Sequence, residues 1–210
     1  WSAGLSRYDT WTDRNELLWV GDGQGALGDW SNDFAAFDPA TFTPNCTVFS
    51  AEEWSGEGRL FETKNPFAPV EDIEVRELDS IANVAHEGLR FSHDKKTLYF
   101  IDEWRSGSIY KFVMKKRGDY TKGQTFVLVV DDYAGNPADY FSDESNVDQP
   151  RTGLATWVPI TDKRGNPLTS VDPFRNGPTN DPRENDDTRG GRPAADEVNG
   201  TPYGRPEDME

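Results

Sequence analysis

Apolar and polar residues alternate in two stretches of the chain that lie about fifty positions apart. The first stretch, 47–54, reads TVFSAEEW, and the second, 97–104, reads TLYFIDEW. Alternation with a period of two is typical of a β-strand that buries one face. Both runs end in two carboxylates and a tryptophan. The sequence therefore predicts two copies of one unit, each with its acids at the end of a strand.

Other short apolar runs, bounded by Gly, Ser, Asp or Pro, predict further strands. The second unit contains three in succession, at 89–92, 97–103 and 108–114, and the tight turns between them predict a meander. We also expect strands at 16–20, 59–63, 124–130 and 153–160, and either a strand or a short helix at 73–83.

Two segments near the N-terminus give weaker signals. The segment 29–44 (DWSNDFAAFDPATFTP) predicts at most a short helical turn, because Pro39 would end a helix. Gly23, Gly25 and Gly28 have the spacing of a dinucleotide-binding loop. That loop needs a long helix directly after it, so we interpret the three residues as turn glycines.

A repeat of about fifty residues with about four strands per unit is typical of a β-propeller. We therefore predict an all-β fold in which residues 1–141 form about three blades of a ring that typically needs four to eight. Chance similarity between two amphipathic strands is the alternative. Residues 142–200, rich in Pro and Asp, predict a long irregular insertion with one strand, and 201–210 is predicted to return to the hub. Because the ring would be incomplete, we interpret the sequence as a fragment.

The excess of acidic over basic residues limits the kinds of molecule that the protein is expected to bind. The chain has 38 Asp and Glu against 22 Lys and Arg, which gives a net charge of −16. This charge repels phosphate backbones, so nucleic acid is not expected as a partner. It also attracts divalent cations, although acids serve equally well to keep a protein in solution.

Two further classes of structure are excluded by composition. No apolar run approaches the ~18 residues of a membrane span. The single cysteine, Cys46, excludes an internal disulfide and a cysteine-based zinc site. We expect Cys46 to be a small buried residue near the start of a strand.

Carboxylates at strand ends are the main candidates for chemistry, because the backbone fixes where they point. The six candidate metal ligands are Glu52, Glu53, Glu87, Asp102, Glu103 and Glu207. Neighbours in a strand face opposite ways, so only one member of each adjacent pair can face a central channel. Converging carboxylates repel one another unless a cation or a proton lies between them, and all-oxygen ligands favour calcium, magnesium or manganese. The alternative is that they are ordinary edge acids, neutralised by Arg59, Arg90 or Arg105.

Two basic side chains are candidates for catalysis. His86 is the only histidine near these acids, which makes it a candidate proton donor, with a structural role as the alternative. Arg205 is a candidate clamp for a phosphate group, or else an ion-pair partner of Glu207.

Three ordered segments resemble a known family. They are TPNCTVFSAEEWSGEGRLFE at 43–62, AHEGLRFS with TLYFIDEWRSGSIYKFV at 85–92 and 97–113, and GTPYGRPEDME at 200–210. Together they resemble the PhoX-like family, secreted bacterial proteins that include the PhoX-type alkaline phosphatases. The resemblance covers most of 17–133 and returns at 199–210.

This resemblance implies a six-bladed propeller, export to the periplasm or beyond, and hydrolysis of phosphomonoesters at a central cluster of calcium with iron. It places metal ligation at Glu52, Glu87 and Glu207. The family's threonine-cysteine-glutamate-glutamate motif falls on Ser50-Ala51-Glu52-Glu53. Because the side chain of Ala51 cannot ligate a metal, calcium is the expected cofactor and iron is disfavoured.

Two functions therefore stay open. The first is a secreted, calcium-dependent, phosphatase-like hydrolase that acts on a small phosphorylated substrate, as a monomer at full length. The second is a non-catalytic propeller that calcium stabilises and that serves as a binding or structural module.

Overall fold

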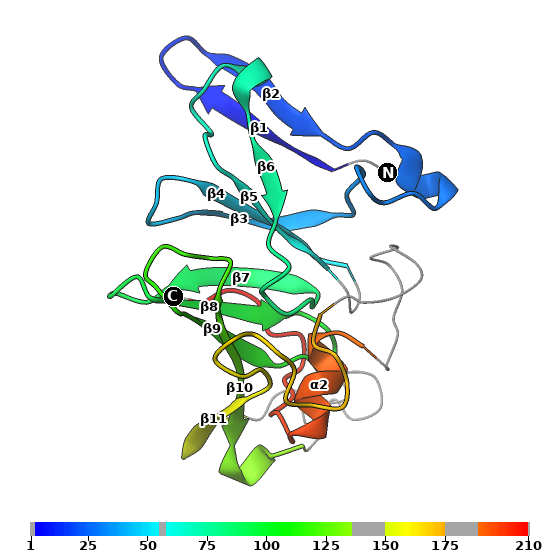
Figure 1. The fold of residues 1–210 in the computed structure, drawn as a ribbon, viewed down its shortest axis with the longest axis vertical. Coiled ribbons are helices and arrows are strands. Elements are labelled where there is room, and N and C mark those ends of the chain that lie inside the picture. Colours follow the sequence, from blue (N-terminus) through cyan, green and yellow to red (C-terminus); the bar gives the residue numbers. More distant parts are fainter. Residues whose placement is uncertain (1–2, 55–57, 136–149, 175–188, 210) are drawn as a thin grey trace.

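The computed structural model describes residues 3–54, 58–135, 150–174 and 189–209. These residues form three antiparallel sheets, which follow one another down the long axis of the molecule, and one α-helix (Figure 1). The all-β class predicted from the alternating pattern is confirmed. The described residues do not form a closed ring of sheets.

Each sheet is a meander in which strands that are consecutive in the chain are also neighbours in space. The first sheet is a hairpin of β1 (Gly4–Asp9) and β2 (Arg14–Val20). The second contains β3 (Phe37–Phe42), β4 (Val48–Glu52), β5 (Leu60–Thr63) and β6 (Val75–Glu77). The third contains β7 (His86–Phe91), β8 (Thr97–Asp102), β9 (Ile109–Met114), β10 (Gly123–Val130) and β11 (Ala155–Pro159). The remaining elements are the 3-10 helices η1 (Gln24–Leu27), η2 (Val70–Asp72) and η3 (Asp131–Tyr133), and the helix α2 (Gly191–Glu197).

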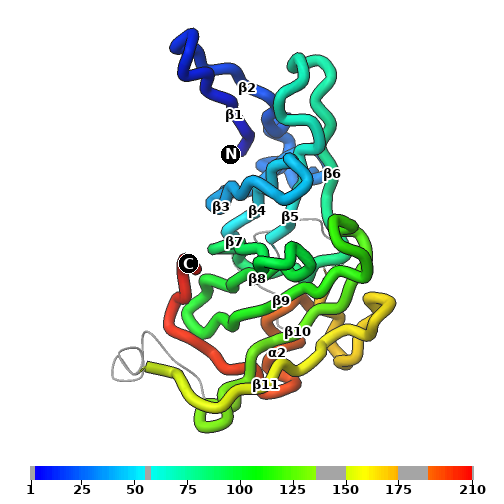
Figure 2. Tube along the Cα trace, turned by 90° about the vertical axis from the view of Figure 1, so that its left-hand side faces the viewer, coloured from blue at the N-terminus to red at the C-terminus, as the bar shows by residue number. Residues whose placement is uncertain are grey.

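The first strands of the second and third sheets, β3 and β7, lie side by side at the same edge of the stack (Figure 2). This arrangement matters for function because both strands carry acidic side chains. It also places the ends of β4 and β8, the next strands inward, close to that edge.

The expectation of at most a helical turn at 29–44 is wrong, because β3 occupies 37–42. Proline removes a ladder hydrogen bond, so it is tolerated on an edge strand or at an irregularity. Pro39 satisfies both conditions, since β3 is an edge strand whose pairing with β4 shifts register between Phe37 and Ala40. Cys46 also differs from expectation. It is exposed, with a φ of 62°, in the turn between β3 and β4.

The main core lies between the second and third sheets. Phe49, Ala51 and Leu60 from the second sheet share one cluster with Leu98, Phe100 and Phe112 from the third, and all are at most 2% exposed. Sheets that pack face to face interdigitate their apolar faces in this way. The two sheets are therefore held as one unit.

The segment predicted as an irregular insertion, 142–200, contains β11 and also the unexpected α2. Ala194 and Ala195 of α2 are fully buried in the main core. Pro193 is tolerated in the first turn of the helix, where the backbone N–H would have no helical partner. Residues 142–149 and 175–188 of this segment lie outside the described residues.

After α2 the chain crosses the ends of the third sheet toward β7. The Thr201 N–H donates to the Leu128 carbonyl of β10 (2.9 Å), and the Tyr203 N–H donates to the Gly107 carbonyl before β9 (2.8 Å). Arg90 of β7 then donates from Nε to the Met209 carbonyl (2.6 Å). The last described residues therefore lie against the edge strand β7.

Within the described ranges, no helix combines the length and the apolar character needed to cross a membrane.

Candidate functional site

The first acid of each repeated pair is buried and bound to an arginine. Glu52 is 0% exposed, and its two oxygens accept from Arg59 Nη2 (2.6 Å) and Nε (2.8 Å). The same oxygens accept from the backbone N–H groups of Ala35 (2.8 Å) and Arg59 (2.9 Å). The carboxylate of Glu52 thus accepts four hydrogen bonds, two from a charged side chain and two from backbone amides, which use its acceptor sites.

Asp102 repeats the arrangement in the third sheet. It is also 0% exposed, and it accepts from Arg192 Nε (2.7 Å) and Nη2 (2.8 Å). The backbone N–H of Ala85 donates to Asp102 at 3.2 Å, from 17 residues earlier, as Ala35 does to Glu52. The repeat seen in the sequence thus extends to the buried hydrogen bonds.

These ion pairs argue against Glu52 and Asp102 as metal ligands. Breaking a buried pair leaves an uncompensated charge, which is strongly unfavourable. Arg59, one of the alternatives named from the sequence, is the partner of Glu52. Arg192, the partner of Asp102, comes from α2, 90 residues farther along the chain.

The second acid of each pair faces the other way and joins an acidic cluster at the edge formed by β3 and β7. The acidic cluster consists of Asp38, Glu53, Glu87, Glu103, Glu207 and Asp208, which interact electrostatically with one another. These residues come from β3, from the ends of β4 and β8, from β7 and from the C-terminal segment. Residues more than 150 positions apart in the chain therefore contribute to one negatively charged surface region.

Glu53 is the centre of this charge. A hydrogen bond with Glu103, together with burial and the negative charges of Glu103, Asp38 and Glu87, raises the pKa of Glu53 to about 8. A hydrogen bond between two carboxyl groups requires that one of them carries a proton. The raised pKa of Glu53 therefore favours a proton between these two acids, at a position where the sequence predicts either a proton or a cation.

Glu87 is the second perturbed acid. Burial, followed by the charges of Asp38, Glu103, Asp208 and Glu207, raises the pKa of Glu87 to about 7. Its Oε2 atom is buried and has no hydrogen-bond partner among the described residues. A buried carboxylate oxygen without a donor is costly, so this atom fits a position that a cation or a water would satisfy.

Arg205 offsets part of the negative charge. Its Nη2 forms an ion pair with Glu103 Oε1, and its side chain is 48% exposed. Glu207 and Glu53 also act on it electrostatically and, with Glu103, raise its pKa. Arg205 therefore lies in the acidic cluster, with one face open to solvent.

A cavity of about 300 Å³ opens between β3 and β7 beside these acids. Asp38, Glu87, Arg90 and Asp208 are among the residues that line it. Gly88 permits the close approach of the C-terminal segment, because a Cβ atom there would lie 3.0 Å from the Glu207 carbonyl oxygen.

The donor set fits a hard divalent cation in chemistry, since every candidate ligand is a carboxylate oxygen. It does not fit iron held by sulfur, because Ala51 is fully buried in the main core and Cys46 is in an exposed turn. In the described part of the chain, no three His, Cys, Asp or Glu side chains are already arranged to hold a metal ion. Binding would require Glu53 to release its proton and Glu103 to separate from Arg205.

His86 lies on the opposite side of β7 from Glu87. Its ring is 0% exposed, packs 5.5 Å from the Phe100 ring, and has no hydrogen-bond partner among the described residues. Burial lowers the pKa of His86 to about 3, so the ring is neutral at ordinary pH. This placement argues against the predicted role as proton donor.

Comparison of the chain with family models, with curated proteins and with solved structures gives no match in any of the three.

Sequence reasoning missed Asp38, Asp208 and Arg192. Asp208 directly follows the predicted ligand Glu207, so its proximity could have been inferred. Asp38 was hidden because β3 was not predicted. No local signal connects Arg192 with Asp102, because their pairing depends on where α2 packs.

Proposed function

We propose that this chain belongs to a secreted, calcium-dependent phosphomonoester hydrolase of the PhoX-like family, built on a β-propeller. In this proposal the three sheets are consecutive blades, β3 and β7 line the central channel, and the acidic cluster lies at the channel. Consecutive meanders with their first strands side by side at one edge support this interpretation.

The observation that carries the proposal is the convergence of Glu53, Glu87 and Glu103. These three carboxyl groups, in β7 and directly after β4 and β8, act on one another electrostatically, and two of them have pKa values raised to about 8 and about 7. Strongly raised acid pKa values caused by neighbouring acids are typical of functional sites. Here they indicate a position where a positive charge is lacking.

The predicted ligand set changes accordingly. Glu53, Glu87 and Glu103, assisted by Glu207 and Asp208, would hold the calcium, whereas the buried ion pairs of Glu52 and Asp102 would support the strand ends. A calcium ion so held would bind substrate phosphate, activate an attacking oxygen and neutralise charge in the transition state.

Arg205 would act on the substrate. In the structure it binds Glu103, the carboxylate that a cation would take over. The released guanidinium, half-exposed beside the cluster, would then be available to bind a phosphate oxygen in a two-pronged manner. His86 has no part in this scheme because it is buried in the core.

Calcium binding by the chain is the first test. Isothermal titration should show saturable binding that is lost in the double variant E53Q/E87Q. The variant E71Q removes one carboxylate from the exposed residue Glu71 in η2 and should bind as the parent does. Equal binding by all three proteins would contradict the assignment of the site.

Hydrolysis is the second test and needs the protein at its native length. Release of nitrophenol from para-nitrophenyl phosphate should require calcium, stop on addition of EGTA and recover when calcium is returned. If the protein binds calcium at this cluster but hydrolyses no phosphomonoester, the proposed calcium site would stand and the proposed enzymatic activity would be rejected.

One observation favours the second candidate, a calcium-stabilised propeller without catalysis. Ala51, which stands at the position of the family's cysteine, is 0% exposed in the main core. A methyl group there contributes packing and offers no ligand. In this case calcium would raise the melting temperature without any accompanying activity, because a ligand that binds only the folded state stabilises it.

A further inference from the structure

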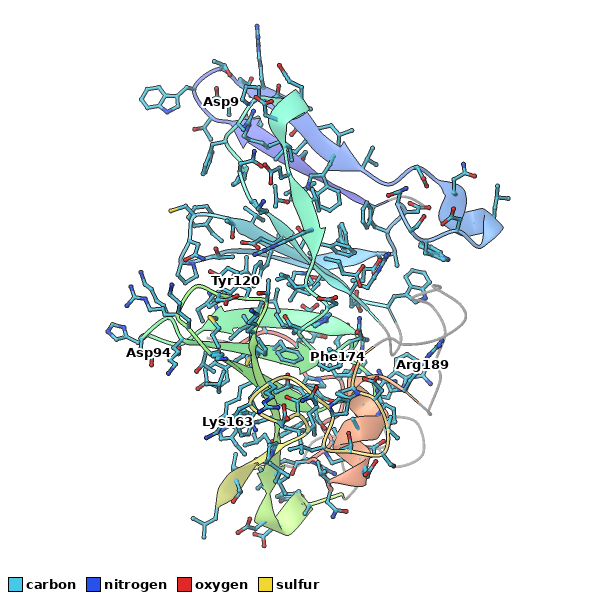
Figure 3. The ribbon with its side chains drawn as sticks, in the orientation of Figure 1. Asp9, Asp94, Tyr120, Lys163, Phe174 and Arg189 are labelled. Atoms are coloured by element: carbon cyan, nitrogen blue, oxygen red, sulfur yellow. The ribbon has the colours of Figure 1, made fainter. Side chains whose placement is uncertain are left out.

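The end of the third sheet opposite the acidic cluster carries the reverse charge. Three turns meet there, 93–96 before β8, 115–122 between β9 and β10, and 162–165 after β11. They contain eight Lys or Arg and three Asp, a net charge of +5 in a chain of net charge −16. Figure 3 labels Asp94 and Lys163 of two of these turns, on the same side of the sheet. Because β8 has six residues, roughly 17–20 Å separates the two ends.

These turns enclose a cavity of about 460 Å³, a size within the range typical of sites for small molecules. Four cationic side chains line it: Lys96, Lys115, Lys163 and Arg164. Its other walls include Val113 and Met114 of β9. The half-buried side chain of Val113 supplies apolar surface, whereas Met114 is 1% exposed and packs in the main core.

The backbone under the cationic side chains is held in place. The Met114 N–H donates to the Lys96 carbonyl (3.0 Å), and the Lys115 N–H donates to the Lys122 carbonyl (2.8 Å). The third turn closes through the Gly165 N–H and the Asp162 carbonyl (3.0 Å). It is joined to β10 because Gln124 Nε2 donates to the Thr161 carbonyl (2.8 Å). The positive charges are thus carried by fixed turns of one sheet.

The nearby acids do not neutralise the four cations by direct contact. Among the described residues, no ion pair includes Lys96, Lys115, Lys163 or Arg164. The acids of the three turns instead accept hydrogen bonds within their own turns. Asp94 accepts from Ser92 and the Lys96 N–H, Asp119 from Thr121, and Asp162 from the Arg164 and Asn166 N–H groups.

We propose that this cavity, the basic cavity, is a binding site for a small organic anion that carries at least two negative charges and an apolar group. The charges would lie among the four cations and the apolar group against Val113. A small ligand fits better than a long polyanion, because the screening length of about 8 Å limits the favourable field to the cavity, and a longer chain would meet the acidic remainder of the surface. The proposal is independent of the cation site.

Naphthalene-1,3,6-trisulfonate is a suitable probe because it combines three fixed charges with an apolar ring. In calcium-free buffer at 150 mM salt, it should bind saturably in isothermal titration. The double variant K96Q/K163Q should bind at least tenfold more weakly. The control K95Q/K122Q removes the same charge from two of the three turns, at lysines outside the cavity lining, and its affinity should stay within about threefold of the parent.

Inorganic pyrophosphate carries negative charge but no apolar group, so it tests whether the apolar group contributes to binding. It should bind more weakly than the trisulfonate. All the substituted lysines are exposed, so thermal melting should confirm that each variant folds. The proposal is overturned by an absence of saturable binding, by equal losses in the two double variants, or by pyrophosphate binding as tightly as the trisulfonate. Binding of the trisulfonate that only the cavity variant loses supports it.

Discussion

Calcium binding at the acidic cluster should release protons, and the number can be worked out from the structure. Glu53 and Glu87 have pKa values of about 8 and about 7 because burial and mutual repulsion favour their neutral forms. If they titrate independently, at pH 7 they are about nine-tenths and about half protonated, so ligation by both as carboxylates expels about 1.4 protons. The apparent affinity should then rise about 20-fold from pH 7 to 9 and fall about 50-fold from pH 7 to 6.

Isothermal titration in buffers with different ionisation enthalpies counts these protons directly. The variant E53Q, which cannot release the first proton, should expel only about 0.5 at pH 7 and should vary only about twofold in affinity between pH 7 and 9. Its affinity should also be lower at every pH because a ligand is lost. Proton release near zero at pH 7 in the parent, or equal release by parent and E53Q, would refute the assignment of the shared proton to Glu53.

The same geometry gives four further predictions. R59M should lower the free energy of unfolding by about 3–5 kcal/mol in urea denaturation, since it leaves a buried carboxylate without its partner, whereas K64M, at an exposed ion pair, should change it far less. Without calcium, the melting temperature should fall as pH rises from 5 to 9. The folded state keeps the Glu53 proton up to a pKa of about 8, the unfolded chain loses it near 4.5, and E53Q should flatten the slope in scanning fluorimetry. R205Q should bind calcium more tightly, because a competing cation leaves Glu103, and should lower kcat/KM for phosphomonoesters about tenfold or more, as enzyme kinetics would measure. G88A should weaken calcium binding severalfold in titration, since its added methyl group would press on the C-terminal segment, and unchanged affinity would separate that segment from the site.

The alternating pattern predicted most of the sheet structure because it has a direct physical cause. β9 and most of β10 alternate buried and half-buried residues, as does the first part of β8, so period two appears in their sequences, whereas β4 is buried on both faces after its first residue. β3 was not predicted because it contains Pro39, and proline is unfavourable in most strands. Proline is tolerated on an edge strand, but the sequence does not reveal which strands lie at an edge.

The candidate site was predictable in part for a related reason. Alternation requires that only one acid of each pair faces the shared edge, yet it does not say which one. The arginines decide this, because Arg59 and Arg192 bind Glu52 and Asp102 and leave the following glutamate of each pair to the cluster. The pairing with Arg192 depends on the packing of a helix far along the chain, which local patterns do not encode.

His86 lies away from the acidic cluster for a simpler reason. Its position next to Glu87 in sequence suggested proximity to the acids, but adjacent residues of a strand point to opposite faces. The ring therefore lies in the core beside Phe100.

The proposed calcium site requires that a cation replaces the proton shared by Glu53 and Glu103. A crystal structure determined with calcium present tests it most directly. We predict a calcium ion bound by oxygens of Glu53, Glu87 and Glu103 at 2.3–2.6 Å, with Arg205 released from Glu103. A structure at saturating calcium in which Arg205 still binds Glu103 and no ion lies among these three carboxylates would contradict the claim.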